Sequence, residues 1–243
     1  MAYKHRMVDS TTSVRDASSE APAAVSPAAT LPLALLVVYA AIWTALAIAP
    51  WYRQDWLLEN LVVAIALPLL VVGYRHLRFS NGSYVAIFLF LVLHAIGAHY
   101  TYAEVPYDRW AQHAMGMSID ALFGFERNHY DRAVHFLYGL LVTPAAVELL
   151  AWAASPRGPW RWLLPLTFMM SHSVAYELVE WAAAIMFGGD LGVAYLGTQG
   201  DVWDAQKDML LASLGCVIAL MSIAARRHRS GAAPGSQPPP PGR

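Results

Sequence analysis

The chain has 243 residues, of which 57% are apolar and only 14% are Asp, Glu, Lys or Arg. A typical soluble domain is about 45–50% apolar and about 25% charged, so the composition excludes an ordinary soluble enzyme. The formal net charge of −1 offers no strongly basic surface for nucleic acid. The single cysteine, Cys216, excludes an intrachain disulfide and a multi-cysteine metal site.

The two ends of the chain differ in composition from its middle. Residues 1–30 are rich in Ser, Thr, Ala and Pro, and residues 226–243 are basic and proline-rich. Segments that can bury so little apolar area do not form a packed core. We therefore predict two disordered cytoplasmic tails flanking one transmembrane domain, residues 31–225.

The middle of the chain holds six apolar stretches that we interpret as membrane helices. About 20 residues, at about 1.5 Å per residue, cross the roughly 30 Å hydrocarbon core of a bilayer. Pro68 interrupts the second stretch, and membrane helices tolerate such a proline as a kink. The predicted fold is an all-α integral membrane protein, a six-span helical bundle with spans at 31–50, 57–74, 82–102, 132–153, 162–187 and 207–225.

The first span has a second interpretation as a cleaved signal peptide, because Ala45-Leu46-Ala47 resembles a signal-peptidase site. A signal peptide has an apolar region of about 7–15 residues close behind basic residues. Here the apolar run has about 20 residues, and the nearest preceding basic residue is Arg15. These features favour a retained helix.

Charged residues are distributed unevenly among the connecting loops. Lys and Arg accumulate in the short loops on the cytoplasmic side of a membrane. With the N-terminus inside, the inner loops contain Arg and no Asp or Glu, whereas the outer segments contain most of the acids. The predicted topology places both termini in the cytoplasm and a polar cluster in the outer half of the bundle.

Ionisable side chains inside membrane helices are costly and usually face the bundle interior, which makes them functional candidates. Asp131 and His135 are spaced i, i+4, so they lie on one helix face. Tyr176, Glu177 and Glu180 cluster in the fifth span, with the two acids one turn apart. All these residues belong to the outer half of the predicted bundle.

The segment before the sixth span adds three acids. Asp201 is placed to cap the following helix, while Asp204 and Asp208 repeat at i, i+4 along one face. Carboxylates and histidine are ligands of divalent metals such as zinc, manganese or magnesium. The predicted metal ligands are Glu177, Glu180, Asp204, Asp208 and His135, of which Glu177, Glu180 and His135 are also the predicted catalytic residues. The predicted supporting residues are Asp131, Asp201, His94, His99, Tyr176 and Lys207.

Some of these residues also have ordinary structural explanations. Capping and the helix dipole favour acids such as Asp201 and Asp204 at a helix N-terminus. A histidine such as His94 is typical of an interhelical hydrogen bond. The structural explanation is weaker for Glu177 and Glu180, because carboxylates this deep in a span need partners in any fold.

Three motifs together resemble one family of bacterial inner-membrane proteins. They are Asn128-His129-Tyr130-Asp131-Arg132-Ala133-Val134-His135-Phe136, Glu177-Leu178-Val179-Glu180-Trp181 and Leu196-Gly197-Thr198-Gln199-Gly200-Asp201-Val202-Trp203-Asp204-Ala205-Gln206-Lys207-Asp208-Met209. Over roughly residues 35–225 the chain resembles the YjdF-like proteins, which implies a multi-pass protein of the bacterial plasma (inner) membrane and no established activity. A looser pattern is similar to VanZ-like membrane proteins, which are linked to the cell envelope. Its residues are Asp131, His135, Phe136, Glu177, Glu180, Asp204, Asp208 and Gly215.

Three functions are compatible with this pattern. The first is a metal-dependent hydrolase or transferase that acts on a lipid-linked or cell-envelope substrate at an outward-facing Glu/Asp/His site. The second is a transporter that carries a cation or a proton on the same acids. The third is an assembly protein in which polar groups only lock the helices. Membrane lipids are expected partners, and the mixture of apolar and polar residues in the outer loop 103–130 is compatible with a helix on the membrane interface. The sequence leaves open whether this loop forms a lid.

Overall fold

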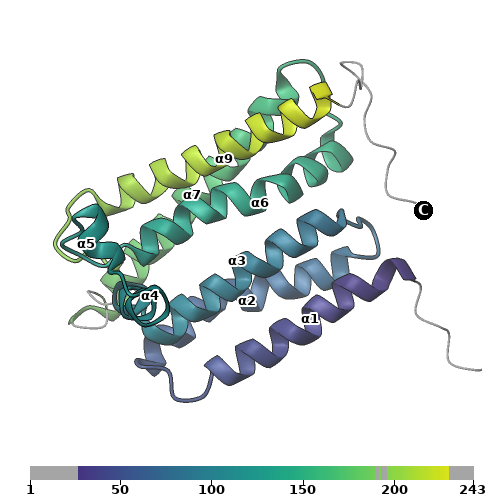
Figure 1. The fold of residues 1–243 in the computed structure, drawn as a ribbon. Helices are drawn as coiled ribbons and strands as arrows, with labels where there is room; N and C mark the ends of the chain where they lie inside the picture. The colour runs from purple at the N-terminus through teal and green to yellow at the C-terminus, as the bar shows by residue number, and fades with distance from the viewer. Residues whose placement is uncertain (1–26, 190–191, 193–195, 230–243) are drawn as a thin grey trace, which may run out of the picture.

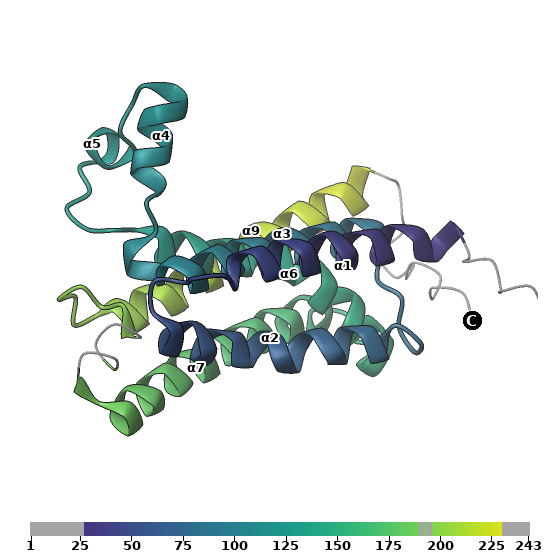
Figure 2. The same cartoon turned by 90° about the horizontal axis from the view of Figure 1, so that it is seen from below.

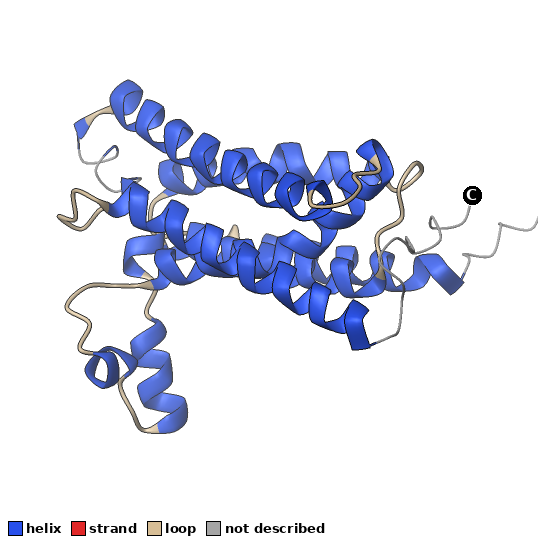
Figure 3. Cartoon of the chain, turned by 90° about the horizontal axis from the view of Figure 1, so that it is seen from above, coloured by secondary structure: helices blue, strands red, loops and turns tan. Residues whose placement is uncertain are grey.

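The structure, a computed structural model, describes residues 27–189, 192 and 196–229. All regular elements in these ranges are helical (Figure 3). The long helices are α1 (Pro27–Leu46), α2 (Arg53–Gly73), α3 (Asn81–Tyr100), α6 (Tyr130–Ala154), α7 (Trp160–Phe187) and α9 (Asp204–Arg229). Between α3 and α6 lie the short helices η1 (Tyr102–Glu104), α4 (Tyr107–Met115) and α5 (Ile119–Phe123).

The long helices have the length and composition of a membrane protein. Within the described ranges, four of them, α2, α3, α6 and α9, are long and apolar enough to cross a membrane. The apolar part of α1, Thr30–Leu46, is shorter. α7 has 28 residues and carries Arg161, Glu177 and Glu180. The prediction of an all-helical membrane protein is confirmed, and each predicted span overlaps one long helix.

The helix ends differ from the predicted ones. α1 begins at Pro27, inside the segment predicted as a tail, and α9 continues to Arg229, beyond the predicted end at residue 225. Basic residues extend the end of α9 because cations interact favourably with the C-terminal dipole. α2 begins at Arg53, which brings Asp55 and Glu59 into its first two turns. The remainder of both predicted tails lies outside the described residues.

The six long helices form two layers. α1, α3, α6 and α9 lie in one layer, and α2 and α7 lie in the other (Figure 2). Direct packing of α1 on α3, α3 on α6 and α6 on α9 follows this order. The start of α1 and the end of α9 lie at one end of the bundle (Figure 1). The opposite end, which carries residues 101–129 and 196–203, is referred to below as the loop end.

Two glycines allow the backbones of α6 and α9 to touch. A Cβ atom on Gly139 of α6 would lie 1.9 Å from the carbonyl oxygen of Ala212, and one on Gly215 of α9 would lie 2.1 Å from that of Phe136. Both distances are far inside van der Waals contact, so a larger residue at either position would force the helices apart. Small residues commonly permit such close packing in membranes. The contact fixes the distance between the helix faces that carry the candidate site.

At the end opposite the loop end, Glu148 of α6 holds the start of α3. Its carboxylate accepts hydrogen bonds from Ser80 N at 2.7 Å, from Ser80 Oγ at 2.6 Å and from Ser83 Oγ at 2.8 Å. Such bonds satisfy N–H and hydroxyl groups at a helix start that would otherwise be left without partners. Glu148 therefore has a structural role, remote from the other membrane acids.

Candidate functional site

One face of α6 carries the middle of the candidate site. Asp131, His135 and Gly139 follow one another at i, i+4 and i+8 in this helix. Residues with this spacing share one face, and Gly139 shows that the face is turned toward α9. Asp131 Oδ1 lies 3.5 Å from His135 Nε2, and both side chains are largely buried.

Two further acids reach this face from neighbouring helices. Glu177 Oε1 of α7 lies 3.6 Å from His135 Nε2. Asp131, His135 and Asp208 of α9 each offer one ligand atom, and these three atoms all lie within 4.8 Å of one another. We refer to Asp131, His135, Glu177 and Asp208 as the acid–histidine centre.

The spacing in the acid–histidine centre is compatible with ligands of a shared ion. Separations of 3.5 and 3.6 Å exceed the usual N–H···O range of about 2.7–3.2 Å. Two atoms each about 2.1 Å from one tetrahedral ion are about 3.4 Å apart. Within the described part of the chain, Glu177 Oε1 and Asp208 Oδ1 are buried and have no hydrogen-bond partner. The centre therefore fits a divalent metal by ligand type, by spacing and by its unpaired oxygens.

Two more carboxylates lie beside the centre. Glu180, one turn beyond Glu177 on α7, is buried, and Glu59 of α2 is only 3% exposed. The Tyr176 hydroxyl donates a hydrogen bond of 3.0 Å to Glu59 Oε2, which ties α7 to α2. Glu180 and Glu59 interact electrostatically with each other and with Asp131. Five carboxylates with little exposure thus surround one histidine.

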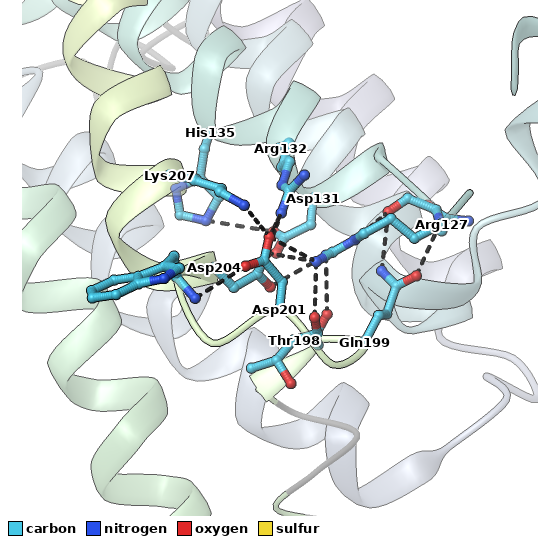
Figure 4. A network of polar contacts seen from close by, with 12 residues as sticks. Arg127, Asp131, Arg132, His135, Thr198, Gln199, Asp201, Asp204 and Lys207 are labelled. Atoms are coloured by element: carbon cyan, nitrogen blue, oxygen red, sulfur yellow. Dashed lines mark hydrogen bonds and ion pairs between the residues drawn. The ribbon is translucent and has the colours of Figure 1, made fainter. Parts of the chain in front are cut away.

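A second polar network lies where the residues before α6 meet the start of α9 (Figure 4). Arg127 and Arg132 contact Asp204 Oδ1 at 2.8 and 2.9 Å. Arg132 also pairs with Asp201, which Lys207 contacts at 2.5 Å. We refer to these five residues as the arginine clamp. Each of its two carboxylates has at least two cationic partners.

Arg127 of the clamp also binds the loop that precedes α9. Arg127 donates hydrogen bonds to the carbonyl oxygens of Thr198 at 2.8 Å and Gly197 at 3.4 Å. Asn128 and Gln199 exchange two bonds, from Asn128 N to Gln199 Oε1 at 2.9 Å and from Gln199 Nε2 to Asn128 O at 3.0 Å. Gly197 has a φ of 60°, a backbone conformation that favours glycine. The loop is therefore fixed to the start of α6 at several points.

Asp201 lies outside the helices and is held in its charged form. Hydrogen bonds from Lys207, from the Trp203 backbone N–H and from Arg132 keep the pKa of its carboxyl well below its usual range. Donors and cations favour the ionised form of an acid. Asp201 accepts the Trp203 N–H at 3.0 Å, three residues before α9 begins, so it shapes the turn rather than occupying the cap position itself.

The two networks divide the residues that the sequence analysis placed in one ligand set. Asp204, a predicted ligand, belongs to the clamp because both of its oxygens contact arginine. Asp131, predicted as a supporting residue, belongs to the candidate ligand group together with His135 and Asp208. Glu180 lies beside this group rather than within it. The three cations of the clamp pair with Asp201 and Asp204, so the acids of the centre require a bound cation or shared protons.

The two histidines of α3 that were predicted to support the site are hydrogen-bonded within the bundle. His94 Nε2 lies 3.1 Å from the backbone oxygen of Glu59, and His94 Nδ1 lies 2.5 Å from the Tyr102 hydroxyl. His99 Nδ1 lies 2.7 Å from the backbone oxygen of Leu46, at the end of α1. Both join α3 to its neighbours, and His94 positions the turn of α2 that carries Glu59.

The sequence analysis missed Asp55, Glu59 and Arg127. Both acids were counted among the charges of the outer segments, although the predicted span 57–74 contains Glu59, because the charge-free core of that span starts only at residue 61. Their i, i+4 spacing directly before an apolar run is the signal that would have found them. Asp55 is buried, accepts a hydrogen bond from Thr101 and has one oxygen without a partner among the described residues. Arg127 has no such signal, because its partners Thr198 and Asp204 lie 71 and 77 residues away.

Together, the fold and the site define a class: a multi-pass helical membrane protein with a buried centre of carboxylates and one histidine at the loop end of its bundle. The chain belongs to the family described as predicted membrane protein (DUF2238), which it matches over residues 31–229. The predicted family resemblance is confirmed.

A curated relative supports the same assignment. The chain is 33% identical over 195 residues to the inner membrane protein YjdF of Escherichia coli (strain K12), an alignment that covers 80% of this chain and 86% of that protein. The protein is therefore a multi-pass inner-membrane protein. No solved structure matches the chain significantly.

Proposed function

We propose that the acid–histidine centre binds one divalent metal ion and that the protein is a metal-dependent hydrolase or transferase. The observation that carries this proposal is the group formed by Asp131, His135 and Asp208, whose ligand atoms lie within 4.8 Å of one another. Carboxylate oxygen combined with imidazole nitrogen suits zinc or manganese, whereas magnesium usually takes oxygen ligands alone.

Each residue near the centre has a distinct part in this proposal. Asp131, His135 and Asp208 would hold the ion, and Glu177, 3.6 Å from His135 Nε2, is placed either to complete the ligand set or to accept a proton. A metal ion bound here supplies an activated water or polarises a phosphoryl or carbonyl oxygen. Glu180, one turn further along α7, is placed to hold a proton beside the centre.

The proposed orientation determines the class of substrate. We propose six spans with both termini in the cytoplasm, because the inner connections carry arginines such as Arg75, Arg78 and Arg157 and no acid. The loop end, and with it the centre, then faces the outer side of the membrane. A site at this depth would meet a lipid-linked or cell-envelope substrate before it met a cytosolic one.

Metal analysis of the purified chain tests this function. The wild-type protein should retain about one zinc or manganese ion per chain after dialysis, and Asp208→Asn should lower the affinity at least about tenfold because a ligand is lost. Glu126→Gln, an exposed acid outside the centre, is the matched control. If folded wild-type protein binds no divalent metal and Glu180→Gln leaves cells unchanged, the enzyme hypothesis is abandoned.

One observation favours a second candidate, a cation or proton transporter. Asp55 and Glu59 lie one turn apart on α2 and interact electrostatically, which extends the acids of the centre toward the loop end. A row of buried acids is typical of ion and proton pathways in membranes. Flux into proteoliposomes that disappears in Glu177→Gln would favour transport over catalysis.

A further inference from the structure

The connection between α3 and α6 contains a helix with two chemically different faces. Along α4, one face carries Tyr107, Trp110, Ala111, Ala114 and Met115, at i, i+3, i+4, i+7 and i+8. The other face carries Asp108, Arg109, Gln112 and His113. This spacing produces an apolar stripe along one side of the helix. α4 is therefore strongly amphipathic although it has only nine residues.

Hydrogen bonds make α4 and α5 a rigid hairpin, residues 107–123. Asp108 accepts hydrogen bonds from Ser118 Oγ at 2.9 Å and from Asp120 N at 3.0 Å. The Tyr107 hydroxyl donates to Asp120 Oδ1 at 2.5 Å and accepts from His129 N at 3.1 Å, which anchors the hairpin to the start of α6. The fold thus holds the apolar residues of the hairpin in a defined position.

The outer edge of the hairpin is apolar and uncovered. Met115, Leu122 and Phe123 are 60%, 62% and 64% exposed. Holding several large apolar side chains in water costs free energy, and such patches usually mark an interaction surface. On the opposite face, Arg109 and His113 line an open cavity of about 480 Å³ with Trp51 and Glu104, which gives the polar side of α4 access to water.

The direction of α4 indicates what covers this edge. α4 is seen nearly end-on in Figure 1, and in Figure 2 it lies crosswise to the long helices and projects from the bundle at the loop end. Because the long helices cross the bilayer, α4 lies along the membrane plane. Leu57 and Leu61 near the start of α2, at the same end of the bundle, are also exposed apolar side chains.

From these observations we propose that the α4–α5 hairpin is a membrane-interface element, which inserts Met115, Leu122 and Phe123 into the lipid leaflet at the loop end. Helices of this kind bury their apolar face roughly 5–10 Å into the boundary between headgroups and acyl chains. The hairpin then holds the polar face of α4 at the height of the headgroups. The proposal is independent of the metal centre.

Depth-dependent fluorescence quenching tests the proposal on the full chain in lipid nanodiscs. An environment-sensitive dye is attached to Phe123→Cys and, as matched control on the polar face, to His113→Cys. The natural Cys216 is fully buried, so wild-type protein treated with the same dye provides the background signal. A nitroxide near the top of the lipid acyl chain should quench the dye at position 123 at least about threefold more than at position 113.

Leu122→Cys repeats the measurement in case loss of the Phe123 ring disturbs its stacking on Phe125. Equal quenching at positions 122, 123 and 113 would overturn the proposal. So would a disulfide between copies through position 123 with little quenching, because the edge would then be a contact between two chains. Metal content is not affected by either outcome, so failure here is distinguishable from failure of the proposed function.

Discussion

The arginine clamp and the acid–histidine centre are built from similar side chains but differ in their balance of charge. In the clamp, two carboxylates face two arginines and one lysine. In the centre and beside it, five carboxylates face one histidine. A network in which every acid has cationic partners is complete within the protein, whereas a network with excess acids requires a bound cation or shared protons. The comparison separates a stabilising role from a binding role.

α9 carries one acid of the arginine clamp and one acid of the acid–histidine centre, about one turn apart. Asp204 contacts Arg127 and Arg132, while Asp208 contributes to the ligand group and has an oxygen without a partner in the described chain. Substitutions at these two positions should therefore have different effects, although the residues are identical and lie on one helix face.

Asp204→Ala should have the largest effect on folding. It leaves Arg127 and Arg132 without their most buried partner, and breaking such a pair costs about 3 kcal/mol or more. The measurement is the free energy of unfolding in detergent, with Glu126→Gln as control. A loss below about 1 kcal/mol would show that the clamp behaves as an ordinary surface ion pair.

Asp208→Asn should remove the response to metal without destabilising the metal-free protein. A ligand present at about 100 times its Kd stabilises the folded state by about 2.7 kcal/mol. Wild-type protein should gain this stability on addition of zinc or manganese, and the variant should gain almost none. Without metal the variant should be as stable as wild type or slightly more stable, because one repelling charge is gone. A marked loss of metal-free stability would assign Asp208 a structural role.

Gly139→Ala should separate α6 from α9. The added methyl group overlaps the Ala212 carbonyl oxygen, and overpacking of this kind costs about 1–3 kcal/mol. Gly73→Ala is the matched control, because a Cβ atom at that helical position meets nothing within 4 Å. Thermal unfolding of both variants measures the difference. Equal stability of the two would show that the helices can part without cost.

Lys207→Met should have the smallest effect, a loss of stability that is present at neutral pH and disappears at low pH. The folded-state pKa of Asp201 is depressed, so its contribution to stability is complete above its unfolded pKa of about 3.9 and is lost as the pH falls through the folded value. Removing the lysine raises the pKa of Asp201 and moves this loss to higher pH. The change should be modest and weaker in high salt, because Lys207 is half exposed. Melting curves from pH 3 to pH 7 would reveal it; identical curves would contradict it.

The sequence predicted local features of this structure well. Charge-free runs located the long helices, and the i, i+4 rule placed Asp131 beside His135. Both depend only on spacing along one helix. The spacing rule also placed Asp204 and Asp208 on one face, but it could not distinguish them, since their roles depend on arginines distant in the chain.

The features that the sequence did not predict depend on contacts between helices. Gly215 belongs to the pattern that is similar to VanZ-like proteins, whereas its counterpart Gly139 becomes visible only when α6 and α9 are seen packed together. Glu59 joins the other acids because His94 and Tyr176 hold α2 against α3 and α7. No pattern within α2 indicates which helix it will face.

The order in which the chain is synthesised gives the clamp a further consequence. Asp204 and Asp208 belong to α9, the last long helix described, whereas Arg127, Arg132 and His135 are made about 70 residues earlier. Until α9 is inserted, Arg127 and Arg132 lie without Asp204 and the ligand group lacks Asp208, so the unfinished bundle is incomplete where its charges are most concentrated. Insertion of the final helix therefore closes the bundle and assembles the site in the same step.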